Sequence, residues 1–383
     1  MAHAPLMDAA PPPTDPQDRQ RRVAVVLLNL GGPDSPAAVR PFLTNLFRDP
    51  AILRVPGIVR PFLGWVIAAL RTKAATANYA ILGGKSPLLE LTRDQAAALE
   101  AALRPEVDAR CFVAMRYWHP FAAETLRDVM AWAPDEVLLL PLYPQFSTTT
   151  TGSSMDDWAD ACRRQGFAVP TTTVCCWHSD PGFAAATARL VQDTYTRARA
   201  DLPADVPLRV LFSAHGLPES IVAAGDPYQW QVEQTVAAVV SHLHIEGLDH
   251  IVCYQSRATP QKWITPSTEA EIERAALEKT AVLICPIAFV SEHSETLVEL
   301  DIEYREKADH VGVPGYFRVP AQNSDAGFIA ALAGIVHRAM AGGRSLCSFA
   351  GPRQCPKAHG DCPHARAGKG GRPALRISEA ASA

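Results

Sequence analysis

The sequence predicts an α/β protein with two doubly wound halves, each built on a parallel four-stranded sheet. About eight short apolar runs alternate with Ala-rich stretches of helical period, which is the β–α alternation of parallel sheets. A chain of 383 residues is also long for a single core, so two halves are favoured over one large sheet. The expected strands are 23–30, 109–114, 136–142, 171–175, 208–212, 251–254, 283–290 and 316–319.

Unusual polar clusters follow several of these strands. They read NLGGPDS, MRYWHP, YPQFSTTTTGSS, SAHGLP and QSRATP in chain order. In open α/β sheets, ligands bind at the carboxyl ends of the strands. We therefore expect a cleft between the two halves that gathers His215, His293 and Glu295 with residues of the first half.

The segment AVLICPIAFVSEHSETLVELDIE, residues 281–303, predicts a strand that runs straight into a helix. Residues 283–290 are apolar without alternation, as in a strand buried on both faces, and Ser291 is a suitable N-cap. Glu295, Glu299 and Glu303 recur every four residues, so one helix face carries three carboxylates. This face either is solvated or lines the cleft. The apolar stripe of the same helix is Leu297, Leu300 and Tyr304.

Composition excludes other classes of protein. The formal charge of −4 and the lack of a basic, aromatic-rich cluster argue against nucleic acid as a partner. Residues 1–21 are rich in Pro, Ala and Asp with no apolar h-region, so we expect a flexible tail and a cytoplasmic protein. The apolar stretch 58–70 is too short to span a bilayer, and core packing, a lip over the site and membrane contact are all compatible with it.

Three of the nine cysteines lie where no core can form. Cys347, Cys355 and Cys362 occur in a Gly-, Pro- and Arg-rich segment with the spacing C-x7-C-x6-C. Metal ligation explains them better than packing does, although an unstructured tail with incidental cysteines is the alternative. A four-coordinate site then needs a fourth ligand from upstream, or from His359 or His364.

Four motifs together resemble the ferrochelatase family, whose members insert ferrous iron into a porphyrin. They are NLGGPDS at 29–35, YPQFSTTTTGSS at 143–154, FSAHGLPESIVAAGDPY at 212–228 and PIAFVSEHSETLVELDIEY at 286–304, and the likeness extends over residues 22–340. The resemblance implies two Rossmann-like domains, with a last helix at 325–340 that packs back onto the first. The expected boundaries are a tail at 1–21, domain I at 22–172 plus 318–343, domain II at 173–317 and a C-terminal extension at 344–383.

By the same resemblance, His215, His293 and Glu295 are catalytic, and His215 and Glu295 also meet the substrate iron. The chemistry agrees, because metallation must remove two pyrrole protons and a neutral imidazole beside a carboxylate can accept them. Glu299, Asp301 and Glu303 match an acidic ladder that conducts metal or protons. The residues implied to contact the porphyrin are Leu30, Tyr79, Ser86, Arg116, Tyr117 and Trp263.

The resemblance also sets expectations for substrate, cofactor and partners. The related enzymes that use coproporphyrin carry Tyr at the position of Leu30. The resemblance therefore implies that the substrates here are protoporphyrin IX and Fe²⁺. Cys347, Cys355 and Cys362 resemble the C-terminal trio that binds a 2Fe–2S cluster in some members; Cys162 is the first candidate for the fourth ligand, and Cys176 or Cys175 the next. We expect no nucleotide cofactor, while peripheral association with the inner membrane and a homodimer stay open. The rival functions are a cobalt-inserting chelatase and a haem or metal carrier without turnover.

Overall fold

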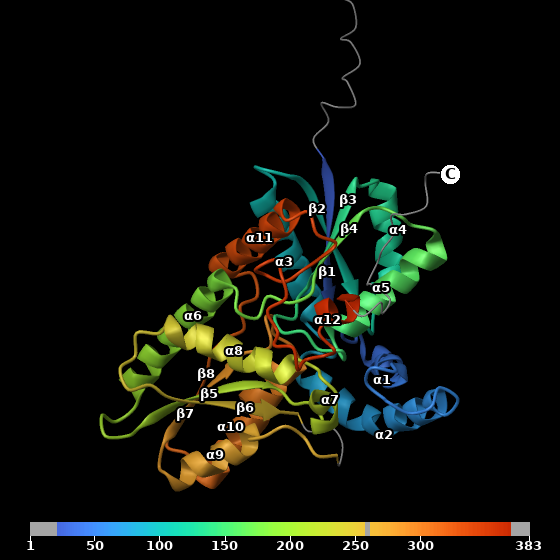
Figure 1. Ribbon diagram of the computed structural model, residues 1–383. Helices are drawn as coiled ribbons and strands as arrows, with labels where there is room; N and C mark the ends of the chain where they lie inside the picture. Colours follow the sequence, from blue (N-terminus) through green and yellow to red (C-terminus); the bar gives the residue numbers. More distant parts are fainter. Residues whose placement is uncertain (1–20, 257–260, 369–383) are drawn as a thin grey trace, which may run out of the picture.

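The computed structural model describes residues 21–256 and 261–368, which form two parallel sheets (Figure 1). The second sheet has four strands in the order β6-β5-β7-β8, as predicted, but the first has five in the order β2-β1-β3-β4-β9. The prediction of four strands was wrong there because two residues of the C-terminal tail pair with the edge of the sheet, Thr173 with Leu346 and Val174 with Cys347. The first sheet consists of β1 (Arg22–Asn29), β2 (Asp108–Met115), β3 (Glu136–Pro141), β4 (Thr171–Val174) and β9 (Leu346–Cys347). The second consists of β5 (Leu208–His215), β6 (Asp249–Gln255), β7 (Ala281–Pro286) and β8 (Tyr316–Arg318).

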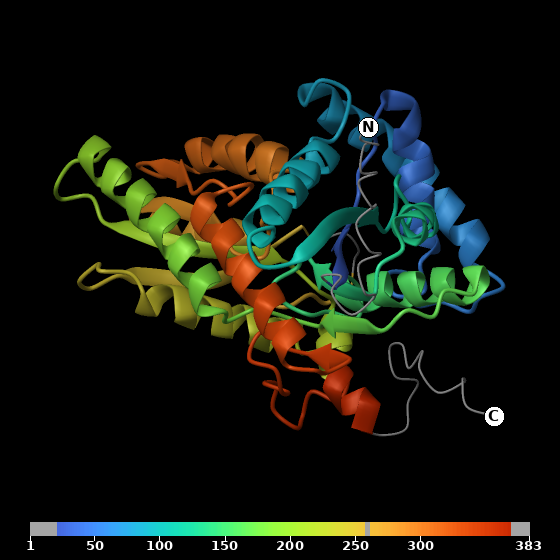
Figure 2. The same ribbon diagram turned by 90° about the horizontal axis from the view of Figure 1, so that it is seen from above.

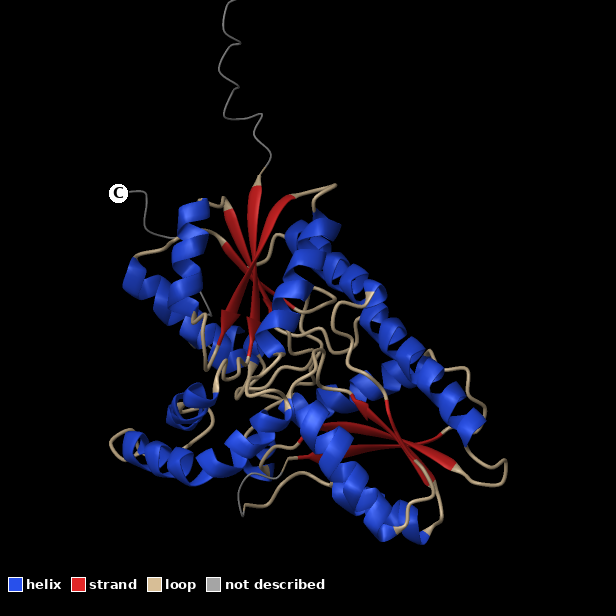
Figure 3. Ribbon diagram, turned by 180° about the vertical axis from the view of Figure 1, so that it is seen from behind, coloured by secondary structure: helices blue, strands red, loops and turns tan. Residues whose placement is uncertain are grey.

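The central strands are apolar along their whole length because helices cover both faces of each sheet. In β1, Val23, Val25 and Leu27 belong to one core cluster, whereas Ala24 and Val26 belong to the cluster on the opposite face. This arrangement is typical of parallel sheets and confirms the predicted α/β class. Figure 3 shows the two sheets as separate fans of strands with the loops gathered between them.

Helices connect and cover the strands. Two long helices, α6 (Pro181–Asp201) and α11 (Ala326–Ala341), lie side by side in Figure 2, and α11 also packs against α3 (Leu88–Leu103) of the first half. Rings of Trp177 and Phe183 meet 5.0 Å apart beneath them, and Trp177 and Phe328 meet at 5.9 Å. The expected packing of the last helix is therefore observed. The helices are η1 (3-10, Pro36–Ala38), α1 (Val39–Arg48), α2 (Arg60–Ile81), α3 (Leu88–Leu103), α4 (Ala122–Trp132), α5 (Thr151–Gln165), α6 (Pro181–Asp201), α7 (Glu219–Ala223), α8 (Tyr228–Ser241), α9 (Thr268–Leu277), η2 (π, Glu295–Glu303), α10 (Tyr304–Val311), α11 (Ala326–Ala341) and α12 (Pro363–Gly368).

The segment after β7 departs from the sequence prediction. The strand ends at Pro286 rather than at residue 290, since proline has no N–H to extend the ladder. A loop follows, and Ser291 does not cap a helix: its hydroxyl donates to Oε1 of Gln95 at 3.0 Å. The helix that starts at Glu295 is a π-helix, a form that is rare and frequent at functional sites.

The ends of the chain lie partly outside the described residues. Of the predicted flexible tail 1–21, only Arg21 is described, and it pairs with Glu136. Within 344–368 the alternative of an unstructured tail was wrong, because β9 and α12 form there and all three tail cysteines are buried. The domain boundaries stay a prediction. Across the part of the chain that the structure describes, no helix has the length and apolarity needed to cross a bilayer.

Candidate functional site

The ends of β5, β6 and β7 bring the predicted site residues together. His215 is the last residue of β5, Gln255 is the last of the neighbouring β6, and the loop after β7 carries His293 to the start of η2. Because parallel strands end at the same edge of a sheet, residues that are up to 80 positions apart in the chain become neighbours here. His215, His293 and Glu295 thus lie at the carboxyl-terminal edge of the second sheet, where the sequence predicted them.

The hydrogen bonds of His215 fix its tautomer. Its Nδ1 lies 2.7 Å from the carbonyl oxygen of Gly216, which can only accept, so Nδ1 carries the proton. In the neutral ring Nε2 therefore bears a lone pair, and it lies 3.5 Å from Oε1 of Glu295. Both side chains are about one third exposed, 34% and 31%. His215 is consequently able to accept a proton at Nε2 and to share it with a carboxylate.

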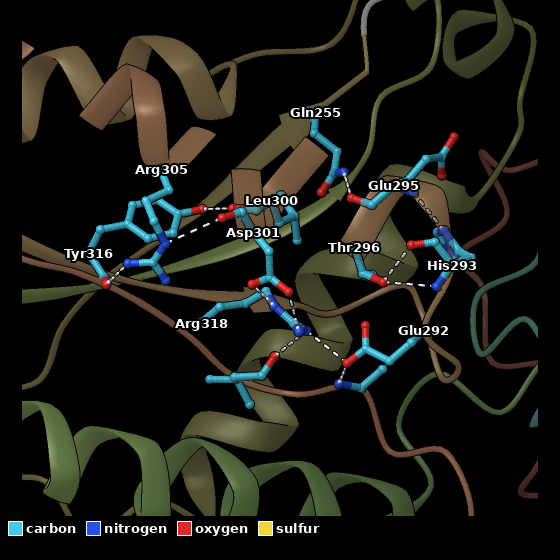
Figure 4. Close-up of polar contacts among 12 residues, drawn as sticks. Gln255, Glu292, His293, Glu295, Thr296, Leu300, Asp301, Arg305, Tyr316 and Arg318 are labelled. Carbon is cyan, nitrogen blue, oxygen red and sulfur yellow. Dashed lines mark hydrogen bonds and ion pairs between the residues drawn. The ribbon is translucent and has the colours of Figure 1, made fainter. Parts of the chain in front are cut away.

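His293 holds the opposite tautomer. Its Nδ1 accepts the backbone N–H of Glu295 at 3.0 Å, so its own proton is on Nε2. Phe289 packs edge-on against the ring, with centroids 4.5 Å apart, and burial lowers the pKa of His293. The contacts between His293, Glu295 and Thr296 are drawn in Figure 4. The geometry makes His293 a neutral N–H donor, whereas His215 is the proton acceptor.

Glu299 is held by three donors. It accepts hydrogen bonds from Gln255 Nε2 at 3.1 Å, Ser256 Oγ at 2.6 Å and Tyr304 OH at 3.0 Å. Burial raises the pKa of Glu299, and the negative charge of Glu295 raises it further. Two neighbouring carboxylates, one of them reluctant to ionise, form an arrangement that can take up and release a proton.

The rest of the predicted acidic ladder is not uniform. Asp301 is paired with Arg318, with Oδ1 to Nε at 2.5 Å and Oδ2 to Nη2 at 2.7 Å, and Arg318 also binds Oε1 of Glu292 at 2.8 Å (Figure 4). Glu303 is exposed, with Asn78 Nδ2 at 3.5 Å from its Oε1. The solvated-face alternative thus fits Glu303 alone. The sequence analysis did not identify Glu292 and Arg318 as site residues, although Glu292 is the central residue of the SEH motif.

Tyr79 and Ser86 bring the first half to this site. The hydroxyl of Tyr79 on α2 bonds to Ser294, and burial raises the pKa of Tyr79 to about 12, with Glu295 adding to the shift. A Cβ on Gly32 would lie 2.5 Å from Cβ and Oγ of Ser86 and 4.0 Å from the hydroxyl oxygen of Tyr79. Only glycine therefore fits where the LGGP loop passes these side chains.

Arg116 and Tyr117 are anchored on one carboxylate. Asp49 Oδ2 accepts from Arg116 Nη2 at 2.9 Å and from the hydroxyl of Tyr117 at 2.7 Å. Tyr117 is 1% exposed, so it supports the wall rather than presenting its hydroxyl to a ligand, whereas Arg116 keeps 21% of its side chain exposed. Leu30 is half-buried and its carbonyl accepts the N–H of Tyr117 at 2.9 Å.

Trp263 packs beside the His215 loop. A Cβ added to Gly216 would lie 3.2 Å from its ring, so glycine at this position lets the indole approach the backbone next to His215. The tryptophan is buried and pairs with Pro218 in an antiparallel bridge.

The tail cysteines gather with Cys175 and Cys176 rather than with Cys162, because Cys347 pairs with the end of β4 and its carbonyl oxygen accepts the N–H of Cys175 at 2.8 Å. Cys176 contributes to the pKa of Cys347, Cys355 and Cys362, whereas burial raises the pKa of Cys162 to about 12 without a contribution from another thiol. The Cys175 thiol donates to Cys176 at 3.7 Å and thereby lowers the pKa of Cys176. In the described residues, no three His, Cys, Asp or Glu side chains are arranged to hold a metal ion.

The tautomer of His293 predicts a pH-dependent stability. Because burial lowers its pKa, the folded protein binds fewer protons at this ring than the unfolded chain, and stability falls as the pH drops below about 6.5. In His293→Asn, Oδ1 can still accept the N–H of Glu295 but cannot titrate. We expect the melting temperature of this variant to fall less than that of the wild type between about pH 7.5 and about pH 5. Parallel losses in differential scanning calorimetry would contradict the assignment.

Comparisons with known proteins identify the family. The ferrochelatase family matches residues 22–340. A ferrochelatase of Phenylobacterium zucineum is 54% identical over 89% of this chain and 97% of its own length, and one of Caulobacter vibrioides is 52% identical over 90% and 97%. A ferrochelatase of Rickettsia bellii is 43% identical over 90% and 95%.

Among solved structures, SirB from Bacillus subtilis with Fe³⁺ aligns over 83% of this chain and 95% of its own length, with 10% identity and a TM-score of 0.47. The sequence matches extend over both halves and all four motifs. The chain therefore belongs to the ferrochelatase family and is a metal chelatase of the lyase class, which inserts ferrous iron into protoporphyrin in the terminal step of haem biosynthesis.

Proposed function

We propose that His215 accepts the pyrrole protons as ferrous iron enters protoporphyrin IX, and that Glu295 receives them from His215. The observation that carries this proposal is the bare Nε2 of His215, which lies 3.5 Å from Glu295 Oε1. Imidazole nitrogen and carboxylate oxygen also suit Fe²⁺ as substrate without holding it as tightly as thiolates would. Each proton lost from the porphyrin thus finds an acceptor, and the metal meets two ligands on the same path.

Glu299 is the next acceptor in this proposal. Its raised pKa favours the protonated form, and its three donors keep it in place beside Glu295. Protons then leave towards the exposed Glu303. Asp301 is assigned a structural role because its charge is neutralised by Arg318.

Porphyrin contacts are proposed for residues of both halves. Arg116, with part of its guanidinium exposed, suits a propionate, while Leu30, Tyr79, Ser86 and Trp263 line the approach to His215 and Glu295. Tyr117 is proposed to act through Asp49, which fixes Arg116.

The central prediction concerns His215 and Glu295. His215→Ala removes the acceptor, so iron insertion should slow by about 100-fold or more, the usual scale for a general base, while porphyrin still binds. Glu295→Gln should lose most activity as well, because the amide cannot take the proton. Steady-state formation of protohaem and quenching of porphyrin fluorescence measure the two quantities.

Glu303→Gln is the matched control, since the same change at the exposed end of η2 should leave the turnover number within about threefold of the wild type. Near-normal turnover in His215→Ala would sink the assignment. A wild type that binds porphyrin and iron without repeated release of protohaem would favour the carrier alternative, and preferential use of Co²⁺ would favour the cobalt chelatase.

A 2Fe–2S cluster on Cys176, Cys347, Cys355 and Cys362 is a second proposal. Such a cluster needs two thiolates at each iron rather than three ligands around one ion. The thiols of Cys355 and Cys362 are hydrogen-bonded to each other, and the backbone of Cys347 is tied beside Cys175 and Cys176 by the β4–β9 ladder. Nδ1 of His178, a residue 2% exposed whose side chain bonds to Cys176, has no hydrogen-bond partner among the described residues. This donor set fits the cluster; when bound, the cluster supplies one-electron redox chemistry and no step of iron insertion.

The cluster proposal predicts a reddish-brown protein with about two iron and two sulfide per chain after anaerobic purification. Cys176→Ser should bleach it, whereas Cys162→Ser, the same change on the buried face of α5, should leave its visible spectrum unchanged. A colourless wild type with zinc or no metal would overturn the proposal, and so would loss of colour only in Cys162→Ser.

We further propose that α2 and the loop before it contact an anionic membrane surface. Ile58, Phe62 and Leu70 are 92%, 70% and 78% exposed, so core packing does not account for them. No Asp or Glu occurs between residues 50 and 89, while the same stretch carries five Lys or Arg residues. An apolar face with basic flanks is typical of a segment that lies on anionic lipid.

If α2 and the loop before it contact anionic lipid, the protein should float with vesicles that contain phosphatidylglycerol. Phe62→Ser should reduce the bound fraction several-fold, because it removes an exposed apolar side chain without touching the core. Leu277→Ser on α9 is the control, as Leu277 is 87% exposed on another surface. Equal binding of all three proteins would contradict the proposed membrane contact. A homodimer in size-exclusion chromatography that Phe62→Ser dissociates would contradict it as well.

A further inference from the structure

The C-terminal tail is attached to both halves of the molecule. Its strand β9 extends the first sheet, while residues near 360 lie against the start of α8, which packs on the second sheet (Figure 1). Asp361 N–H donates to the carbonyl of Gly225 at 3.1 Å. A Cβ on Gly225 would lie 2.9 Å from the backbone nitrogen of Gly360, so the two chains touch directly. Rings of Trp230 and His359 meet 5.8 Å apart.

Gln231, on the first turn of α8, lies at the centre of this junction. Its side chain is fully buried, and Oε1 accepts the N–H of Phe146 in the first half at 2.7 Å. That bond fixes which end of the amide is oxygen, so the NH₂ group must face the other way. There it lies 3.1 Å from Sγ of Cys355. The same amide also bonds to Cys176.

We propose that Gln231 is a positioning residue for the thiol centre, which donates to its sulfurs and joins it to the second half of the molecule. The inference rests on the proposed cluster ligands Cys176, Cys347, Cys355 and Cys362. Hydrogen bonds to the sulfurs of an iron–sulfur cluster stabilise its reduced, more negative state and so raise its reduction potential. Gln231 therefore sets the potential from a helix that belongs to the other half.

A mechanical consequence follows for the two halves. Gln231 contacts Phe146 of the first half with its oxygen and the tail with its nitrogen, so an assembled cluster closes a ring of contacts through α8, β9 and the loop after β3. Without the cluster, the hydrogen bond between Gln231 and Cys355 alone closes that ring at the sulfur, because no metal then joins Cys355 to the other cysteines. Cluster assembly should then reduce the motion of α8 relative to the first sheet.

The test is a redox titration of the full chain, purified anaerobically and followed by its visible and electron paramagnetic resonance spectra. Gln231→Glu keeps the acceptor for Phe146 but replaces the donor by a negative charge beside the sulfurs, so the reduction potential should become more negative than in the wild type. Gln231→Leu should lower it as well. Gln234→Leu makes the same change three residues further along α8 and should leave the potential unchanged.

Hydrogen exchange of the wild type with and without the cluster supplies a second readout that needs no variant. Amides of residues 225–231 should exchange more slowly in the cluster-loaded protein. If the cluster is present but both glutamine variants keep the wild-type potential, or exchange at 225–231 is unaffected, the role of Gln231 is overturned while the cluster stands. A wild type without a cluster overturns both proposals and leaves the proposed role of His215 untouched.

Discussion

The guanidinium of Arg318 is the contact on which the site depends. It lies at the end of β8, is 12% exposed, and binds Glu292 before the π-helix and Asp301 within it. Glu292 also accepts the backbone N–H of Ala321 at 2.9 Å, so the loop is tied to the chain beyond β8 as well. Removing one partner of a buried ion pair leaves an uncompensated charge and costs about 3–5 kcal/mol. The segment that carries His293 and Glu295 is therefore held at both ends by one cation.

Hydrogen bonds to the backbone determine the tautomers of the two histidines. The carbonyl of Gly216 requires a proton on Nδ1 of His215, and the N–H of Glu295 requires a lone pair on Nδ1 of His293. Two residues of the same type thus acquire opposite abilities, one as acceptor and one as donor at Nε2. The two histidines therefore offer complementary groups to the proton transfer that we propose.

The sequence predicts the fold class and the location of the site, but not the hydrogen bonds and ion pairs within the site. Continuous apolar runs such as 136–142 are sufficient for buried strands, and the motifs at strand ends correctly placed His215 near Glu295. The fifth strand has only two residues, Leu346 and Cys347, too few for any periodic signal. The π-helix has no sequence period of its own here. The ion pair between Asp301 and Arg318 joins residues 17 positions apart, with α10 between them in the chain. The β4–β9 ladder, which brings Cys347 beside Cys175 and Cys176, likewise joins segments about 170 residues apart, so Cys176 is proposed as the fourth ligand from the structure and not from the sequence.

The proposed proton transfer rests on the tautomers of the two histidines, which nitrogen-15 NMR of the imidazole rings measures. At a pH where both rings are neutral, we expect a protonated Nδ1 and a bare Nε2 for His215, and the reverse for His293. Variants His215→Ala and His293→Asn assign the two sets of signals. A proton on Nε2 of His215 in the resting protein would contradict its role as the proton acceptor.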